Sequence, residues 1–309
     1  MNFLSMKYFA AVAKEKNFTH AARALHITQQ TLSTHIASIE KELGCPLLLR
    51  TTPLQLTYQG EVFLRYARQF EKLYLSLNQE FADLRAETKG LLRVGIAHTR
   101  GRALLPEIIE AYHKKYPLIE LQLIEGTNEF LRHSLLDGDA DLLIAHFPVE
   151  MPGVRLQPFY EEELVLLIAN RLLDEIYGEK ALGLLQQIHR PQDLSLLADC
   201  PFLLGNQEDV GGRLGNQMIA EALVSPQITA QSTNIETLLE LCLRGTGACF
   251  CPDVLVRRLL SPVQLQSVQM LRFEERVRYR ISFGWLERPY CWSAISHFSA
   301  LALSLMHRK

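Results

Sequence analysis

The stretch that decides the fold of the N-terminal part is NFTHAARALHITQQTLSTHIASIEKELG, residues 17–44. Its second half carries apolar residues at 4-3-4 spacing, on one face of a helix: Leu32, Ile36, Ile39 and Leu43. Thr28 is a natural N-cap for that helix and Gly44 a natural stop. A shorter Ala-rich helix precedes it, with Thr19 as the expected N-cap. Two such helices joined by His26 and Ile27 predict a helix-turn-helix, whose second helix can enter the major groove of DNA.

The other face of this second helix carries mostly short polar side chains. They are Gln30, Thr31, Ser33, Thr34 and Lys41, with Ala37 among them. Amides and hydroxyls of this size can hydrogen-bond to base edges and phosphates. A solvated helix face would have the same pattern, so these residues alone leave both interpretations open.

The charge of the chain is unevenly distributed. Residues 1–60 carry six Lys and Arg and three Asp and Glu, a net charge of +3, whereas the whole chain has −2. The N-terminal sixty residues are therefore the candidate for binding an anionic partner.

A hairpin and a long helix are expected next. Two short strands, at Leu47 to Leu49 and near Leu54 to Thr57, predict a wing tipped with Arg50. From Gln59 the pattern is helical for about 29 residues, with an apolar stripe close to a heptad repeat: Phe63, Tyr66, Phe70, Leu73, Leu77, Phe81 and Leu84. We expect this stripe to pair with a second subunit; packing against its own chain is the alternative.

From Leu91 the period changes repeatedly between strand and helix, which is typical of an α/β domain with a mainly parallel sheet. Strands are expected at 92–96, 119–124, 141–145, 164–169, 202–204, 248–251, 268–271 and 280–285. Helices are expected at 102–116, 128–136, 212–223, 234–243 and 290–306. Two subdomains within this one domain, between which the chain crosses twice, would leave a ligand cleft between them. Residues 174–198 hold an extra segment with a helix at 181–188.

Several classes of protein are disfavoured. The longest apolar run, Leu164 to Ala169, is too short for a membrane span, and no secretory signal is visible, so we expect a cytoplasmic protein with no membrane partner. No GxSxG, HExxH, P-loop or GxGxxG motif occurs, so we expect no enzyme activity. The six cysteines have no zinc-like spacing, so no metal site is predicted.

Residues 1 to about 65 resemble the winged helix-turn-helix of LysR-type transcriptional regulators. The matching residues are Phe9-x-x-Val12-Ala13, Phe18-Thr19-x-Ala21-Ala22-x-x-Leu25, Thr28-Gln29, Leu32-Ser33, Ile36, Glu40-x-Glu42-Leu43-Gly44, Leu47, Arg50, Leu56-Thr57 and Gly60. The rest is similar to the effector domain of that family, including Gly126-Thr127, the stretch Gly138 to Leu142, and Gly245-x-Gly247.

This resemblance implies an α/β protein with three parts. A winged helix-turn-helix DNA-binding domain occupies 1–58, a linker helix for dimerisation 59–89, and an effector-binding domain 90–309, whose two subdomains resemble periplasmic binding proteins. Subdomain I is expected at 90–161 and 268–309, and subdomain II at 162–267. The resemblance also implies a homodimer or homotetramer that binds double-stranded promoter DNA and needs no cofactor beyond a small-molecule co-inducer.

The DNA-binding residues carried over from the family are Thr28, Gln29, Gln30, Thr31, Ser33, Thr34, His35, Arg50, Thr51 and Thr52. Gln30 stands where the family often has Pro, and Thr34 where it often has Arg or Lys. One phosphate or guanine contact is therefore in doubt, and the operator sequence does not transfer.

The ligand-binding residues implied in the same way are His98, Thr99, Arg100, Thr127, Asn128, His146, Phe202 and Gly205. Hydroxyls and helix starts favour an anion, and Arg100 with two histidines would strengthen that preference, so we expect an organic anion as effector.

A thiol-based redox sensor of the same architecture is the alternative. Cys249 and Cys251 alternate as in a strand, and Cys242 lies one helix earlier.

Overall fold

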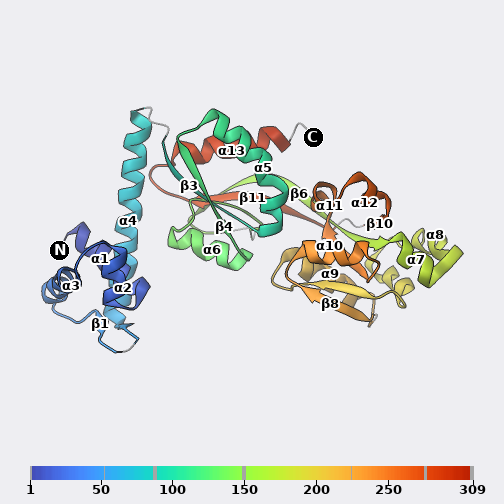
Figure 1. The fold of residues 1–309 in the computed structure, drawn as a ribbon, viewed down its shortest axis with the longest axis horizontal. Coiled ribbons are helices and arrows are strands. Elements are labelled where there is room, and N and C mark those ends of the chain that lie inside the picture. The colour runs from blue at the N-terminus through green and yellow to red at the C-terminus, as the bar shows by residue number, and fades with distance from the viewer. Residues whose placement is uncertain are drawn as a thin grey trace. The chain divides into compact units, whose positions relative to one another are not determined.

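The computed structural model describes residues 2–51, 53–85, 89–147, 151–223, 225–274 and 277–306. The chain divides into two compact units, Met1–Glu87 with Arg288–Trp292, and Thr88–Glu287 with Ser293–Lys309. Each unit is described by itself; both are drawn in Figure 1.

The first unit is a winged helix-turn-helix followed by a long helix, as the sequence predicts. Its elements are α1 (Phe3–Glu15), α2 (Phe18–Ala24), α3 (Gln29–Leu43), the antiparallel hairpin β1 (Leu48–Leu49) and β2 (Gln55–Leu56), and α4 (Tyr58–Leu84). Thr28 caps α3, and Gly44 ends it in the left-handed region, as expected. The cap of α2 is different: Asn17, not Thr19, accepts hydrogen bonds from the Thr19 and His20 amides. Asn17 stands one residue before the helix, where a side-chain oxygen can reach those amides.

The core of this unit holds the hairpin against α3. Leu32, Ile36 and Ile39 are buried with residues of α1 and of the hairpin. Glu40 accepts hydrogen bonds from the amides of Leu47 (2.7 Å) and Leu48 (3.2 Å), so α3 and the wing are joined directly.

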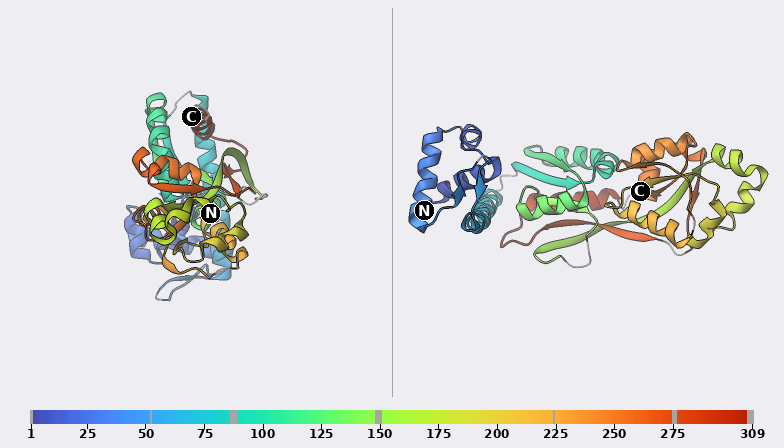
Figure 2. Two further views of the ribbon diagram at one scale, coloured as in Figure 1. Left: turned by 90° about the vertical axis from the view of Figure 1, so that its right-hand side faces the viewer. Right: turned by 90° about the horizontal axis from the view of Figure 1, so that it is seen from below.

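The second unit contains two helix-covered halves connected by two long strands (Figures 1 and 2). The first half consists of β3 (Gly90–Ile96), α5 (His98–Lys115), β4 (Ile119–Glu125), α6 (Asn128–Asp137), β5 (Leu142–Ala145) and α13 (Ser293–Met306). The second half consists of α7 (Asn170–Tyr177), α8 (Ala181–Leu185), β7 (Phe202–Gly205), α9 (Val210–Glu221), β8 (Ile228–Ser232), α10 (Ile235–Leu243), β9 (Ala248–Pro252), α11 (Asp253–Leu259), α12 (Pro262–Gln266), β10 (Val268–Leu271) and short 3-10 turns at Gly178–Lys180 and Pro191–Leu197.

The connecting strands are β6 (Val154–Ala169) and β11 (Arg278–Leu286), which pair antiparallel from Arg278 opposite Glu163 to Leu286 opposite Val154. In the first half, β3 is parallel to both β4 and β5; in the second, β7 is parallel to both β8 and β9. The two predicted crossings are therefore confirmed. Helices cover both faces of each half; in the first, α5 and α13 pack together and α6 contacts β3 and β5.

Three expectations need correction. Strand β10, expected in subdomain I, pairs with Leu166–Ala169 of β6 and so belongs to the sheet of the second half. The strand expected at 164–169 is the end of a 16-residue strand, since β6 begins at Val154 and its first part pairs with β11. The extra segment forms α7, α8 and the turn at Pro191–Leu197, and the expected helix at 181–188 is shorter, ending at Leu185. No helix among the described residues is long and apolar enough to cross a membrane.

Candidate functional site

The exposed face of α3 is polar and partly bonded to itself. Gln29, Gln30, Thr31 and Thr34 are exposed and Ser33 is half-buried. The Thr34 hydroxyl donates to the carbonyl of Gln30 (2.9 Å), and Thr28 and Thr31 share a hydroxyl hydrogen bond (2.8 Å). Gln29 accepts from Thr19 of α2 (3.2 Å), which fixes its carboxamide. The hydroxyl proton of Thr34 is thus already used in a hydrogen bond within α3.

His35, predicted with this group, is turned toward α1 instead. Its Nδ1 lies 2.9 Å from the Ser5 hydroxyl, and its ring meets that of Tyr8 edge-on at 4.9 Å. The side chain is half-buried in this packing. It orients α3 on α1 in this structure.

The wing presents Arg50 and Thr51 to solvent. The Thr51 hydroxyl donates to the carbonyl of Pro53 (2.8 Å), which shapes the turn. Thr52, predicted beside them, lies outside the described residues. Behind the hairpin, a Cβ added to Gly60 would come within 2.0 Å of the Leu47 carbonyl oxygen, so only glycine allows α4 to start against the wing.

The stripe on α4 divides into two parts. Tyr66, Phe70, Leu73, Leu77, Phe81 and Leu84 are 49% to 75% exposed. Phe63, expected in the same dimerisation stripe, is only 8% exposed and its ring packs edge-on against that of Phe9 at 5.0 Å. Phe63 is therefore a core residue of the helix-turn-helix unit, because the first turns of α4 lie on α1.

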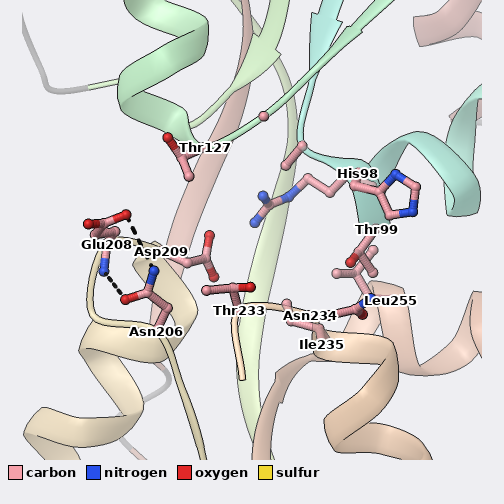
Figure 3. A pocket seen from close by; sticks show the side chains of 13 residues that line it. His98, Thr99, Thr127, Asn206, Glu208, Asp209, Thr233, Asn234, Ile235 and Leu255 are labelled. Atoms are coloured by element: carbon pink, nitrogen blue, oxygen red, sulfur yellow. Dashed lines mark hydrogen bonds between the residues drawn. The ribbon is translucent and has the colours of Figure 1, made fainter. Parts of the chain in front are cut away.

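A pocket of about 310 Å³ lies in the second unit where four helices begin (Figure 3). It is lined by Ala97, His98, Thr99 and Arg100 at the start of α5, Gly126 and Thr127 before α6, Asn206, Glu208 and Asp209 before α9, Thr233, Asn234 and Ile235 at α10, and Leu255 of α11. Three of these helices have side-chain caps, from Thr127, Asp209 and Asn234. At α5 the capping position is Ala97, which offers no acceptor.

Four predicted ligand residues, His98, Thr99, Arg100 and Thr127, line this pocket. The other four lie elsewhere. Asn128 is half-buried outside the lining, and the His146 Nδ1 donates to the carbonyl of Arg280 (3.1 Å). Phe202 is buried in the core of the second half, and Gly205 lines an adjoining cavity. Phe202 fills the core because its side of β7 faces α9.

The positive charge of Arg100 is already paired with a carboxylate of the protein. Its guanidinium donates to both carboxylate oxygens of Glu162, at 2.8 and 2.7 Å, and both side chains are buried. Tyr160 donates to the same carboxylate (2.8 Å), and the Tyr279 hydroxyl lies 3.4 Å from the guanidinium. Burial alone would raise the pKa of Glu162, but Arg100 outweighs it and holds that pKa below the ordinary value. The expectation that Arg100 would attract an anion is therefore corrected by this pairing.

Sequence reasoning missed the wall formed by Asn206, Glu208 and Asp209. The Asn206 amide donates to Glu208 (3.4 Å), and the Glu208 backbone amide donates back to Asn206 (3.2 Å). A signal was present, since Asp209 is followed by Val210-Gly211-Gly212 and caps α9. In the described part of the chain, no group of three or more His, Cys, Asp or Glu residues is placed to hold a metal ion.

The thiols of the second half are enclosed. Cys242, Cys249 and Cys251 are at most 1% exposed. Burial raises the pKa of Cys251 well above its ordinary value, and the neighbouring Cys242 together with burial does the same for Cys249. The reactive thiolate form is thus disfavoured at both.

Comparison with known proteins gives the same architecture over the whole chain. Residues 85–306 match the LysR substrate binding domain, and residues 3–61 match the family described as bacterial regulatory helix-turn-helix protein, lysR family. The chain is 26% identical over 282 residues to the HTH-type transcriptional activator IlvY of Salmonella typhimurium, covering 91% of this chain and 92% of that protein.

Two solved structures share the fold. A full-length OxyR variant from Pseudomonas aeruginosa has a TM-score of 0.68 at 23% identity, covering 99% of this chain and 94% of that one. Full-length CbnR complexed with its target DNA has a TM-score of 0.59 at 23% identity, covering 99% of each chain. The matched family consists of transcriptional regulators rather than enzymes. The chain therefore belongs to the LysR family of DNA-binding transcriptional regulators.

Proposed function

We propose that the exposed face of α3 reads the promoter sequence and that the wing contacts the DNA backbone. Gln29, Gln30 and Ser33 supply the amides and hydroxyl that suit base edges, and Arg50 supplies a charge for phosphate. Thr28, Thr31, Thr34, Thr51 and Thr52 complete the proposed surface. His35 supports it from behind, because its ring is bonded to Ser5.

We further propose that a small molecule in the pocket at the four helix starts modulates promoter binding. The observation that carries this proposal is the pocket itself, which is of metabolite size and is formed by both halves of the unit. The start of α5 has no side-chain cap, so the backbone amides of its first turn suit an acidic group of the ligand. A ligand that contacts both halves stabilises their closed arrangement and shifts the population toward it.

The exposed stripe of α4 supports a homodimer, with a homotetramer as the larger assembly. Six large apolar side chains along one 27-residue helix form an exposed apolar surface, and its contact with water is unfavourable. A second copy of the same helix offers the complementary stripe.

The test is a footprint of the full-length protein on the DNA upstream of its own gene, at fixed salt. We expect protection of a long, partly palindromic site, and a change in that footprint when metabolite pools are added. Thr233→Trp, which fills the pocket, should remove the response and keep the footprint. Ser225→Trp, on an exposed loop outside the pocket, is the matched control and should keep both. A response unaffected by Thr233→Trp would overturn the effector site.

A further inference from the structure

The inference concerns the chemical class of the effector and rests on the proposed function of the pocket. Four charged or titratable side chains line the pocket: His98, Arg100, Glu208 and Asp209. Two of these already have a carboxylate as partner. Arg100 is bound by Glu162, and the His98 Nδ1 lies 3.1 Å from a carboxylate oxygen of Glu125. The net charge that the lining presents to a ligand therefore depends on Glu208 and Asp209.

Glu208 and Asp209 have no cationic partner within the described ranges of the chain. Glu208 is exposed, and its carboxylate accepts from the amide of Asn206 (3.4 Å); Asp209 is half-buried and accepts from the backbone amide of Gly211 at 3.2 Å. Both carboxylates come from the loop before α9, in the second half of the unit, and Figure 3 shows Asp209 directed into the pocket. A half-buried carboxylate such as that of Asp209 is stabilised by a cation that replaces lost water contacts, and the exposed Glu208 adds a second negative charge nearby.

The opposite wall of the pocket favours negative charge instead. It is the start of α5, where no side chain caps the helix and Thr99 lies in the first turn, together with Thr127, which precedes α6 in the same half. Helix starts carry partial positive charge and favour a carboxylate. The pocket thus has a positive wall in the first half of the unit and a negative wall in the second.

We infer that the effector is a small zwitterion, an α-amino acid or a close relative, with its carboxylate at the start of α5 and its ammonium between Glu208 and Asp209. Such a ligand satisfies both walls at once, whereas a plain organic anion leaves the two carboxylates unpaired and meets their repulsion. Because the two walls belong to different halves, one zwitterion links them and holds the pocket closed. The amino group, through the loop before α9, becomes the feature that the protein distinguishes.

The experiment measures binding to the full-length protein by calorimetry. The probes are the twenty protein amino acids, each paired with the acid that lacks its α-amino group and the amine that lacks its carboxylate. We expect at least one amino acid to bind, with its two partners weaker by about tenfold or more, as expected for the loss of a hydrogen bond to a charged group. Glu208→Gln and Asp209→Asn should weaken the amino acid by about tenfold and leave the deaminated acid unchanged or tighter. Asp209→Asn keeps the helix cap, because asparagine caps equally well.

Glu221→Gln, on the exposed end of α9 outside the pocket, is the matched control and should bind like the unchanged protein. Binding of a deaminated acid as tightly as its amino acid, or of no amino acid at all, would overturn the zwitterion. If an acid alone binds and alters the footprint, the ligand class is wrong and the proposed function stands. If an amino acid binds as predicted but the footprint never changes, the ligand class stands and the proposed regulatory role fails.

Discussion

Arg100 and Glu162 form a two-point ion pair, at 2.8 and 2.7 Å, in which the guanidinium is 2% exposed and the carboxylate is fully buried. The arginine belongs to α5 beside the pocket, and the glutamate belongs to the connecting strand β6. The pair therefore joins the pocket wall to the strand that both halves share. Each charge is tolerated inside the unit because the other is present.

Removing the arginine should be strongly destabilising. Arg100→Met leaves the Glu162 carboxylate buried without its partner, so we expect a loss of about 3–5 kcal/mol in the free energy of unfolding, measured with urea. The double variant Arg100→Met with Glu162→Leu should recover most of the loss, because two apolar side chains of similar size need no partner. Equal stability of the single and double variants would show that the lost packing, and not the orphaned charge, is responsible.

The same pair predicts a pH dependence with a definite sign. The pKa of Glu162 is lowered from its ordinary value of 4.5. The folded protein thus binds this proton more weakly, and the stabilisation is complete above about pH 4.5 and lost as the pH falls through the lowered value. In Arg100→Met, burial alone raises the pKa of Glu162, so protonation favours the folded state.

The difference in stability between Arg100→Met and the unchanged protein should therefore shrink between pH 7 and pH 4. Urea denaturation at several pH values checks this. Other carboxylates titrate in both proteins and cancel in the difference. Parallel curves for the two proteins would contradict this account of Glu162.

On DNA, the α3 face and the wing should respond differently to substitution. Gln29→Ala and Ser33→Ala should weaken binding to the promoter more than to random DNA, since one lost base contact costs about 1–3 kcal/mol. Arg50→Ala should weaken both and reduce the salt slope by about one. Lys180→Ala, exposed in the second unit, is the control. Equal losses on both DNAs for Gln29→Ala would remove its proposed role in base reading.

Substitutions along the stripe on α4 should affect assembly and folding separately. Leu77→Glu places a charge in the exposed stripe, so we expect smaller assemblies by light scattering, with unfolding free energy changed by about 0.5 kcal/mol or less within the isolated chain. Asn78→Glu, one residue away, should leave the assembly intact. Phe63→Ala should instead cost about 3–5 kcal/mol, because its ring fills the core beside Phe9. Unchanged assembly in Leu77→Glu would place the interface elsewhere.

Oxidation should have little effect on DNA binding. Cys249 and Cys251 are buried, and both thiol pKa values are raised. In a Cys291→Ser background, which removes the exposed thiol, equimolar peroxide should leave the footprint and the thiol count unchanged. A footprint that shifts with peroxide in this background, and no longer shifts after Cys249→Ala, would favour the redox alternative.

Local patterns in the sequence were enough to predict the first unit, because its contacts are local. The spacing of Leu32, Ile36 and Ile39 predicted the buried face of α3, although Leu43, the fourth residue of that spacing, is 43% exposed; Thr28 and Gly44 predicted the ends of the helix. Phe63 was misplaced because the heptad-like stripe continues without a break into residues that pack on α1. Periodicity alone does not say which partner covers a residue.

The pocket could be predicted only on one side. His98, Thr99 and Thr127 were expected there because the family resemblance implied them, and they line the pocket. The loop carrying Glu208 and Asp209 reaches the pocket only because β6 and β11 cross between the halves. Likewise, Arg100 and Glu162 are 62 residues apart, and no local signal indicates that they pair. The charge of the pocket therefore depends on long-range topology.

The 16-residue strand β6 also limits how this chain can be divided. Its first part pairs with β11, and its last part pairs with β9 and β10, so one uninterrupted strand is a structural member of two cores. A nick or a recombination breakpoint in a surface loop frees neither half, because independent modules separate only where few contacts cross. Exchange of sensory halves between relatives would need matched junctions within both β6 and β11. The halves of the second unit are therefore separable only by matched breaks in both strands, whereas the first unit consists of residues 1–87 and the short returning segment 288–292.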